Sequence, residues 1–121
     1  MSTGSRKSLD SSPDETRIFE KGKIDLANFS DYVTIGRAIF EPGWSWKKCV
    51  KPIAKTNSCQ APHIVYIISG RMKVVMDDGT EVESGPGEAV IIPRGHNAWV
   101  VGNEPRIAID FTGAKKYAKS Q

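Results

Sequence analysis

The chain has 121 residues, of which 39% are hydrophobic and 26% charged. We expect a chain of this size and composition to form one soluble globular domain, too short for a two-domain enzyme. The chain has only two cysteines and two histidines. Any thiol chemistry, and any metal site with sulfur or imidazole ligands, must therefore draw on Cys49, Cys59, His63 and His96.

The net charge of +3 comes from the end of the chain. Lys115, Lys116 and Lys119 account for all of it, because the other basic residues balance the 14 acidic ones. A neutral body with a short basic tail argues against nucleic-acid binding.

Hydropathy argues against a membrane protein. No apolar run approaches the roughly 20 residues that span a bilayer, and the polar N-terminus lacks the apolar stretch of a signal peptide. We therefore expect a cytoplasmic protein with reduced thiols. A disulfide between Cys49 and Cys59 is the less favoured alternative.

Composition divides the chain into three parts. Residues 1–16 are rich in Ser and Asp and are predicted to be a disordered tail. Residues 17–113 form the predicted domain, and residues 114–121 form a basic tail in which a short helix is predicted over 114–119.

The predicted domain reads as all-β. Short β-branched or aromatic runs alternate with turns rich in Gly, Pro and Asp, and no long stretch has helical periodicity. An Asp-Gly pair at Asp78 and Gly79 predicts a tight antiparallel hairpin. Short strands with such turns indicate a sandwich or barrel. Strands are predicted over 33–40, 44–50, 63–69, 72–76, 89–92, 98–101 and 106–111.

Two segments carry a family resemblance. The first is Tyr66-Ile67-Ile68-Ser69-Gly70-Arg71-Met72, and the second is Gly85-Pro86-Gly87-Glu88-Ala89-Val90-Ile91-Ile92-Pro93-Arg94-Gly95-His96. In spacing and order they resemble the two conserved motifs of the cupin superfamily, over roughly residues 35–111. The resemblance implies a small jelly-roll β-barrel of cupin type and a homodimer.

The metal pattern of that family is altered in this chain. Cupins commonly hold a divalent metal with His-x-His and Glu of the first motif and a His of the second. Here His63 stands at the Glu position, and Asn57 and Cys59 stand at the His-x-His positions. Ala98 takes the place of the last His, and His96 lies two residues earlier. The usual iron or manganese ligand set is therefore missing.

A different metal site is predicted from the residues that remain. Strands alternate their side chains, so inward residues of several strands can converge on one point. Two thiolates and two imidazoles suit a divalent metal, with zinc favoured over iron. The predicted ligands are His63, His96, Cys59 and Cys49. The alternative is structural: cysteines that merely pack and histidines that are hydrogen-bonded in the core.

Aromatic residues close to the motifs suggest a ligand pocket. Trp46, Tyr66 and Trp99 are the candidates for an apolar wall around a small molecule. Trp44 and Trp46 are two residues apart and are expected to share a face, which fits a packed core equally well.

Basic residues near the first motif suggest an anionic ligand. Lys47, Lys48, Lys51 and Lys55 lie in a segment without acids, which predicts either a solvated edge or a rim that attracts anions. Arg71, Arg94 and Arg106 are predicted to be solvated.

Three functions remain open at this point. The first is a cupin that binds a small molecule or a divalent metal without turnover. The second is a metal-dependent dioxygenase, isomerase or lyase, and the third is a structural or interaction protein with a filled barrel. With two histidines no Ser-His-Asp order is convincing, so no catalytic residue is assigned.

Overall fold

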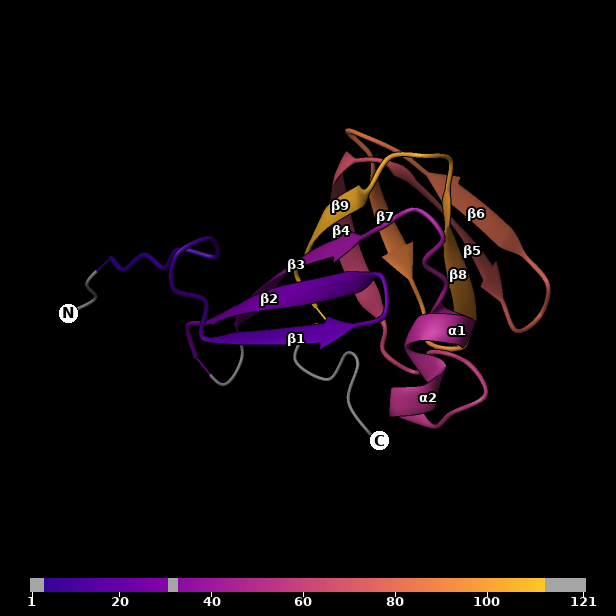
Figure 1. Ribbon diagram of the computed structural model, residues 1–121, viewed down its shortest axis with the longest axis horizontal. Helices are drawn as coiled ribbons and strands as arrows, with labels where there is room; N and C mark the ends of the chain where they lie inside the picture. Colours follow the sequence, from indigo (N-terminus) through magenta and orange to yellow (C-terminus); the bar gives the residue numbers. More distant parts are fainter. Residues whose placement is uncertain (1–3, 31–32, 113–121) are drawn as a thin grey trace.

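A computed structural model describes residues 4–30 and 33–112, and within them nine strands form two antiparallel sheets (Figure 1). None of the helices in these residues is long and apolar enough to cross a membrane. The strands are β1 Glu15–Phe19, β2 Gly22–Asn28, β3 Thr34–Phe40, β4 His63–Ser69, β5 Arg71–Met76, β6 Glu81–Ser84, β7 Ala89–Ile92, β8 His96–Val101 and β9 Arg106–Asp110, and the short helices are α1 Trp46–Cys49 and α2 Lys51–Ala54.

The larger sheet has the strand order β1-β2-β3-β9-β4-β7, and the smaller has the order β6-β5-β8. Two isolated bridges, Ser45 with Trp99 and Cys59 with His96, join the long connection between β3 and β4 to β8 in the smaller sheet. This connection holds both helices and lies at one end of the sandwich (Figure 1). The prediction of an all-β fold of jelly-roll type is confirmed, with two short helices as the only other regular elements in residues 4–30 and 33–112.

Most predicted strands agree with the observed ones within one or two residues, but the prediction for 44–50 is wrong. That segment turns into α1, because the Ser45 hydroxyl accepts a hydrogen bond from the Lys48 backbone N–H at 3.2 Å and caps the helix. Trp46 and Cys49, three residues apart, are the buried face of the turn. The sequence prediction also missed β1 and β2. The helix predicted over 114–119 lies outside the described residues.

The N-terminal segment forms no strand or helix between residues 4 and 14, in keeping with the predicted tail. The sheet begins at Glu15, slightly before the predicted domain start at residue 17. Arg37 of β3 pairs with Asp10 of the tail at 2.6 Å and with the buried Asp25 at 3.2 Å.

The core lies between the sheets and receives the inward side chains of both. On β4, the residues His63, Val65 and Ile67 are buried, whereas the residues between them are exposed. The largest fully buried side chains are Trp44, Trp46, Ile24, Leu26, Ile67, Val50, Val74 and Asp25.

Gly70 makes the tight connection from β4 to β5. Its backbone has a positive φ of 75°, which L side chains rarely adopt. A Cβ at this position would collide with the Pro105 carbonyl oxygen and lie 2.5 Å from the Arg106 Cα. Gly70 therefore allows the start of β9 to approach the β4–β5 turn.

We expect Gly70→Ala to lower the free energy of unfolding by about 3 kcal/mol, the left-handed backbone costing about 1–2 kcal/mol and the collision adding the rest. Gly79→Ala is the matched control: its φ is 90° but nothing lies within 4 Å of the added Cβ. That variant is expected to lose only about 1–2 kcal/mol. Urea denaturation measures both, and equal losses would contradict the close approach.

Candidate metal centre

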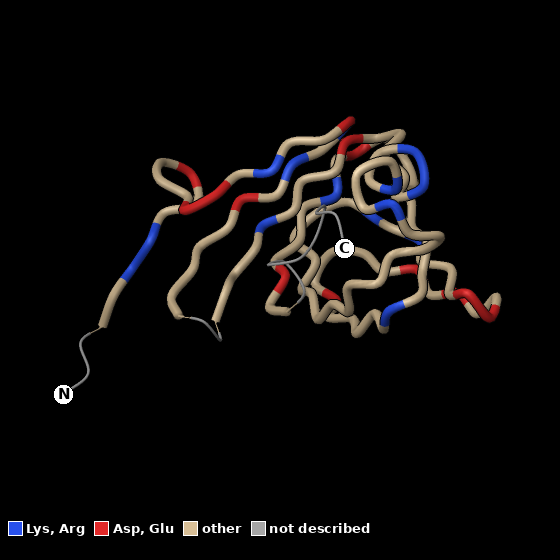
Figure 2. Tube along the Cα trace, turned by 90° about the horizontal axis from the view of Figure 1, so that it is seen from below, with Lys and Arg blue, Asp and Glu red and all other residues tan. Residues whose placement is uncertain are grey.

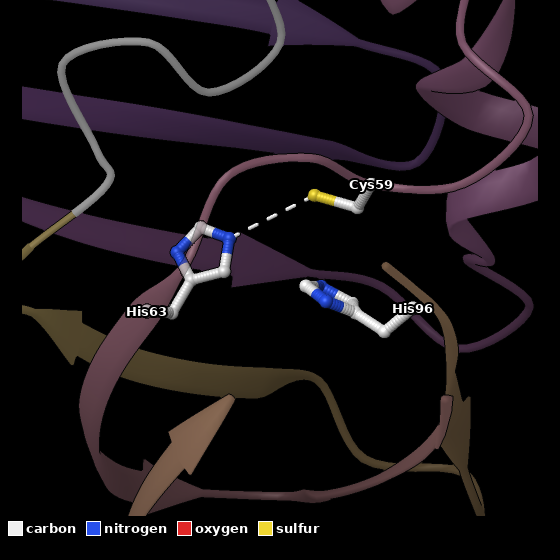
Figure 3. Close-up of side chains that lie close together, drawn as sticks. All are labelled: Cys59, His63 and His96. Atoms are coloured by element: carbon white, nitrogen blue, oxygen red, sulfur yellow. Dashed lines mark hydrogen bonds between the residues drawn. The ribbon is translucent and has the colours of Figure 1, made fainter. Parts of the chain in front are cut away.

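Three of the four predicted ligands meet inside the molecule. One ligand atom each of Cys59, His63 and His96 lies within 4.8 Å of the others, and all three residues are buried (Figure 3). The fourth candidate, Cys49, is not in this group. It lies in α1 with its Sγ 3.9 Å from a Glu20 carboxylate oxygen, and both cysteines are free.

A backbone bridge brings Cys59 to His96. The Cys59 N–H donates to the His96 carbonyl and the Gly95 N–H donates to the Cys59 carbonyl, both at 2.7 Å. Gly95 has a φ of 89°, and a Cβ on it would lie 2.8 Å from an Asp77 carboxylate oxygen. The glycine of the second motif thus turns the chain so that His96 can begin β8.

His63 begins β4 and is held by a carboxylate behind it. Its Nδ1 lies 2.5 Å from Asp110 Oδ2, and Asp110 also accepts the Thr112 backbone N–H at 2.9 Å. Asp110 comes from the neighbouring strand β9, where it pairs with Val65. With Nδ1 engaged, His63 turns its Nε2 to within 3.9 Å of the Cys59 Sγ (Figure 3).

His96 is oriented by its own turn. Its Nδ1 lies 2.8 Å from the Pro93 carbonyl oxygen, which can only accept a hydrogen bond, so Nδ1 carries a proton. In the neutral ring the lone pair is then on Nε2. Metal-binding histidines in proteins typically donate their other ring nitrogen to a carboxylate or a carbonyl in this way.

The buried thiol and imidazole are electrostatically coupled. Burial alone would raise the pKa of the Cys59 thiol, but hydrogen bonds and charge from His63 and His96 outweigh it and lower the pKa from 9.0 to about 6. Burial likewise opposes protonation of His63, but Asp110 and then Cys59 raise its pKa from 6.5 to about 9. Near neutral pH, Cys59 is therefore a thiolate and His63 an imidazolium.

A cavity of about 30 Å³ adjoins the two histidines. This is room for roughly two water molecules. Its wall is mostly apolar, and its lining residues are Ile24, Ala38, Phe40, Trp44, Trp46, His63, Val65, Met72, Ile92, His96, Ala98, Arg106, Ala108 and Asp110.

Of the aromatic residues predicted to form a pocket, Trp46 lines this cavity. Tyr66 is on the outer face of β4, where 45% of it is exposed. Trp99 is half-buried and alternates with the inward-facing Ala98 and Val100 of β8. Trp44, which is not among the three predicted pocket residues, lines the cavity as well.

The sequence reasoning missed two polar residues of the interior, Asp110 and Arg106. Both are buried and line the cavity, so the prediction that Arg106 is solvated is wrong. In β9 the charged residues Arg106 and Asp110 point inward. The isoleucines between them, Ile107 and Ile109, are only half-buried, although apolar residues are expected on the inner face. The alternation of the two charged residues with isoleucines predicts the opposite orientation of the strand, so no local signal in the sequence identifies them as inward.

The low pKa of Cys59 can be measured directly. In zinc-free Cys49→Ser protein, Cys59 is the sole thiol, and its far-ultraviolet thiolate absorbance is expected to titrate with a midpoint at about pH 6. His63→Gln removes the positive neighbour while burial remains, so its midpoint should move upward. A parent midpoint close to 9.0 would contradict the coupling.

No family model matches the chain, and no curated protein matches it at the level of sequence.

Solved structures do match it closely in fold. The polyketide cyclase RemF from Streptomyces resistomycificus is 20% identical with a TM-score of 0.64, the match covering 91% of this chain and 79% of that one. KdgF from Halomonas sp. is 16% identical with a TM-score of 0.63, covering 92% and 94%. An RmlC-like cupin from Shewanella frigidimarina is 15% identical with a TM-score of 0.61, covering 96% and 98%. The chain therefore folds as a small cupin domain.

Proposed function

We propose that the protein binds one zinc ion through Cys59, His63 and His96 and uses the adjoining cavity to bind a small molecule. The observation that carries the proposal is the convergence of these three buried side chains, each histidine having its other ring nitrogen already engaged. Four-coordinate zinc would leave one position for water or a ligand.

The residues fit a zinc ion in size. Zn–S bonds of about 2.3 Å and Zn–N bonds of about 2.0–2.1 Å put tetrahedral ligand atoms roughly 3.3–3.6 Å apart. The Cys59 Sγ and His63 Nε2 are 3.9 Å apart, and all three donors lie within 4.8 Å of one another. Small side-chain rotations are enough to close the remaining gap.

The donor set favours zinc over iron. A thiolate with two imidazoles matches the borderline-soft character of zinc, whereas non-haem iron oxygenases use two histidines and a carboxylate. The Asp110 carboxylate is engaged by the Nδ1 of His63 and acts behind that histidine.

The cavity distinguishes the alternative functions. An interior filled by side chains is disfavoured because space remains beside His63 and His96. A metal-dependent enzyme needs space for a substrate at the free metal position. The cavity beside His63 and His96 offers such space only to a very small molecule. RemF, named as a polyketide cyclase, has the same fold and supports this alternative only by analogy.

One further function is favoured by a specific contact. Cys59, His63 and Asp110 lie in the order nucleophile, base and orienting carboxylate, which is the arrangement of a thiol-dependent transferase or hydrolase. That arrangement gives His96 no role, although its imidazole lies beside the thiol. Zinc accounts for all three residues and is therefore preferred.

Zinc binding can be tested with matched cysteine variants. We expect the parent to bind one zinc per chain in competition with a chromophoric chelator. Cys59→Ala and His96→Ala should lower the affinity about 100-fold or more, and Asp110→Asn, which acts behind His63, about 10- to 100-fold. Cys49→Ala is the control and should bind like the parent. A Cys59→Ala variant that retains parental affinity would rule out the proposed ligand set.

We also propose a homodimer. It is supported by exposed apolar side chains on the outer face of two paired strands, β4 and β7, namely Ile64, Tyr66, Ile68 and Ile91. Isolated exposed apolar residues are common, but contiguous ones mark interaction surfaces.

A cytoplasmic location is proposed as well, supported by the two free cysteines.

Sedimentation equilibrium tests the dimer. Ile91 is 71% exposed, and Ile91→Lys should convert the dimer into a monomer because it places a charge in the apolar face. Val82→Lys, on β6 of the other sheet, is the control and should leave the dimer intact. A parent that sediments as a monomer at every concentration would overturn the dimer.

A further inference from the structure

The turn that follows β5 is tied to the chain next to His96. Asp77 is the first residue of this turn, and its backbone N–H donates to the Gly95 carbonyl at 2.8 Å. Gly95 directly precedes His96, which pairs across β5 and β8 with Met76, the last residue of β5. The main chain of Asp77 therefore holds the turn from which a candidate ligand begins its strand.

The Asp77 side chain reaches the segment that carries Cys59. Its Oδ2 accepts a hydrogen bond from the Ser58 hydroxyl at 3.0 Å, and Ser58, which is 7% exposed, directly precedes Cys59. The Ser58 Oγ in turn accepts from the side-chain amide of Gln60 at 3.1 Å, which leaves its single proton for the carboxylate. A hydrogen bond to an ionised acceptor is roughly twice as strong as one between neutral groups.

Gly95 allows the same carboxylate to lie against the turn before His96. A Cβ at Gly95 would lie 2.8 Å from Asp77 Oδ2, the oxygen that the Ser58 hydroxyl contacts. The Gly95 N–H also donates to the Cys59 carbonyl at 2.7 Å, so the two ligand segments are joined by backbone at this point as well. One aspartate thus bridges the residues that directly precede Cys59 and His96.

This bridge attaches a segment that has no strand of its own. Cys59 lies outside the strands and pairs with His96 through an isolated bridge. The hydroxyl of Thr56 and the amide of Gln60 form their hydrogen bonds with Ser58, inside the same segment. The bond from Ser58 to Asp77 therefore adds a side-chain attachment to the smaller sheet where the backbone pairing is only one residue long.

Asp77 shares its turn with a second aspartate that has different contacts. Asp78 Oδ1 accepts from the Thr80 backbone N–H at 2.9 Å and from the Thr80 hydroxyl at 2.7 Å, both within the turn. Acidic residues mark this end of the β5–β6 hairpin, whereas lysines mark α1 and α2 (Figure 2). Loss of either aspartate removes one negative charge from the same turn, but the bonds of Asp78 do not reach the ligand segments.

We infer that Asp77 is a positioning residue of the metal centre, which sets the distance between the Cys59 and His96 donors by holding Ser58 against the turn before His96. Its effect on metal affinity rests on the proposed zinc site. A metal centre binds tightly when its ligands are held within about 0.5 Å of the bound geometry. Without Asp77 the Cys59 segment samples other positions, so a smaller fraction of molecules is competent to bind the metal.

Zinc affinity, measured in competition with a chromophoric chelator, tests this role. Asp77→Ala and Ser58→Ala should each weaken zinc binding about tenfold, at the lower end of the effect of groups that support metal ligands. The double variant should bind no more weakly than the weaker single variant, because both changes remove the same hydrogen bond. Asp77→Asn retains an acceptor oxygen and should recover most of the affinity. Asp78→Ala controls for charge and turn stability and should bind like the parent.

The thiol of Cys59 gives a second readout that needs no metal. Cys59 is buried, so a disulfide reagent reaches it only when its segment opens locally. The rate is measured in zinc-free Cys49→Ser protein at alkaline pH, where the thiol is ionised. Asp77→Ala should raise this rate about tenfold, in proportion to the loss of the closed conformation, whereas Asp78→Ala should react like the parent.

The two readouts separate the positioning role from the zinc site. If the parent binds no zinc, the proposed function fails, and a tenfold faster reaction of Cys59 in Asp77→Ala still supports the positioning role. Parental zinc affinity in Asp77→Ala and Ser58→Ala, or losses that add in the double variant, would overturn that role and leave the zinc site standing. Equal thiol rates in Asp77→Ala and Asp78→Ala would overturn it as well. Ser58→Ala leaves the turn intact and decides the matter if Asp77→Ala fails to fold.

Discussion

The hydrogen bond between His63 and Asp110 is the contact on which the interior depends. It joins the first residue of β4 to the last residue of β9 inside an apolar core, where an unpaired charge would be costly. By fixing Nδ1, it turns the other ring nitrogen toward Cys59. Asp110 thus orients a ligand, raises the pKa of His63 and, through that imidazolium, lowers the pKa of the Cys59 thiol.

The fold provides the remaining geometry through backbone pairing. The connection between β3 and β4, which are both strands of the larger sheet, reaches the smaller sheet on its way and pairs with β8 at Cys59. That pairing places a residue outside any strand beside His96, and the rigid sheets hold His63 opposite. Since Cys59, His63 and His96 come from separate parts of the chain, the candidate centre forms only when both sheets are assembled. A bound metal would therefore stabilise the folded state by mass action.

Much of the fold could be predicted from the sequence, because the glycine and proline turns and the strand runs are local signals. Gly87, Pro93 and Gly95 identified the second motif, and the inward position of His63 was indicated by its place at the Glu position of the first motif. The helix at Trp46 could not be predicted, since its alternating aromatics also fit a strand and the Ser45 cap decides the outcome.

Three of the four residues named from the sequence as candidate ligands lie together in the structure, whereas the contacts that support them were not predicted. Only the structure separates Cys59 from Cys49, because the bridge to His96 is a long-range pairing that no local pattern contains. Asp110 and Arg106 were missed since the isoleucines between them suggest the opposite face as the inner one. The outer isoleucines of β4 and β9 give both faces of the sheet an apolar appearance, so polarity alone cannot orient these strands.

X-ray absorption spectroscopy of the zinc-loaded protein is the most direct test of the metal centre. The account predicts one sulfur at about 2.3 Å and two imidazole nitrogens at about 2.0–2.1 Å, with one further light atom from water or a ligand. A first shell that contains no sulfur, or two sulfurs, would contradict it, because Cys59 is the one cysteine that lies with the two histidines.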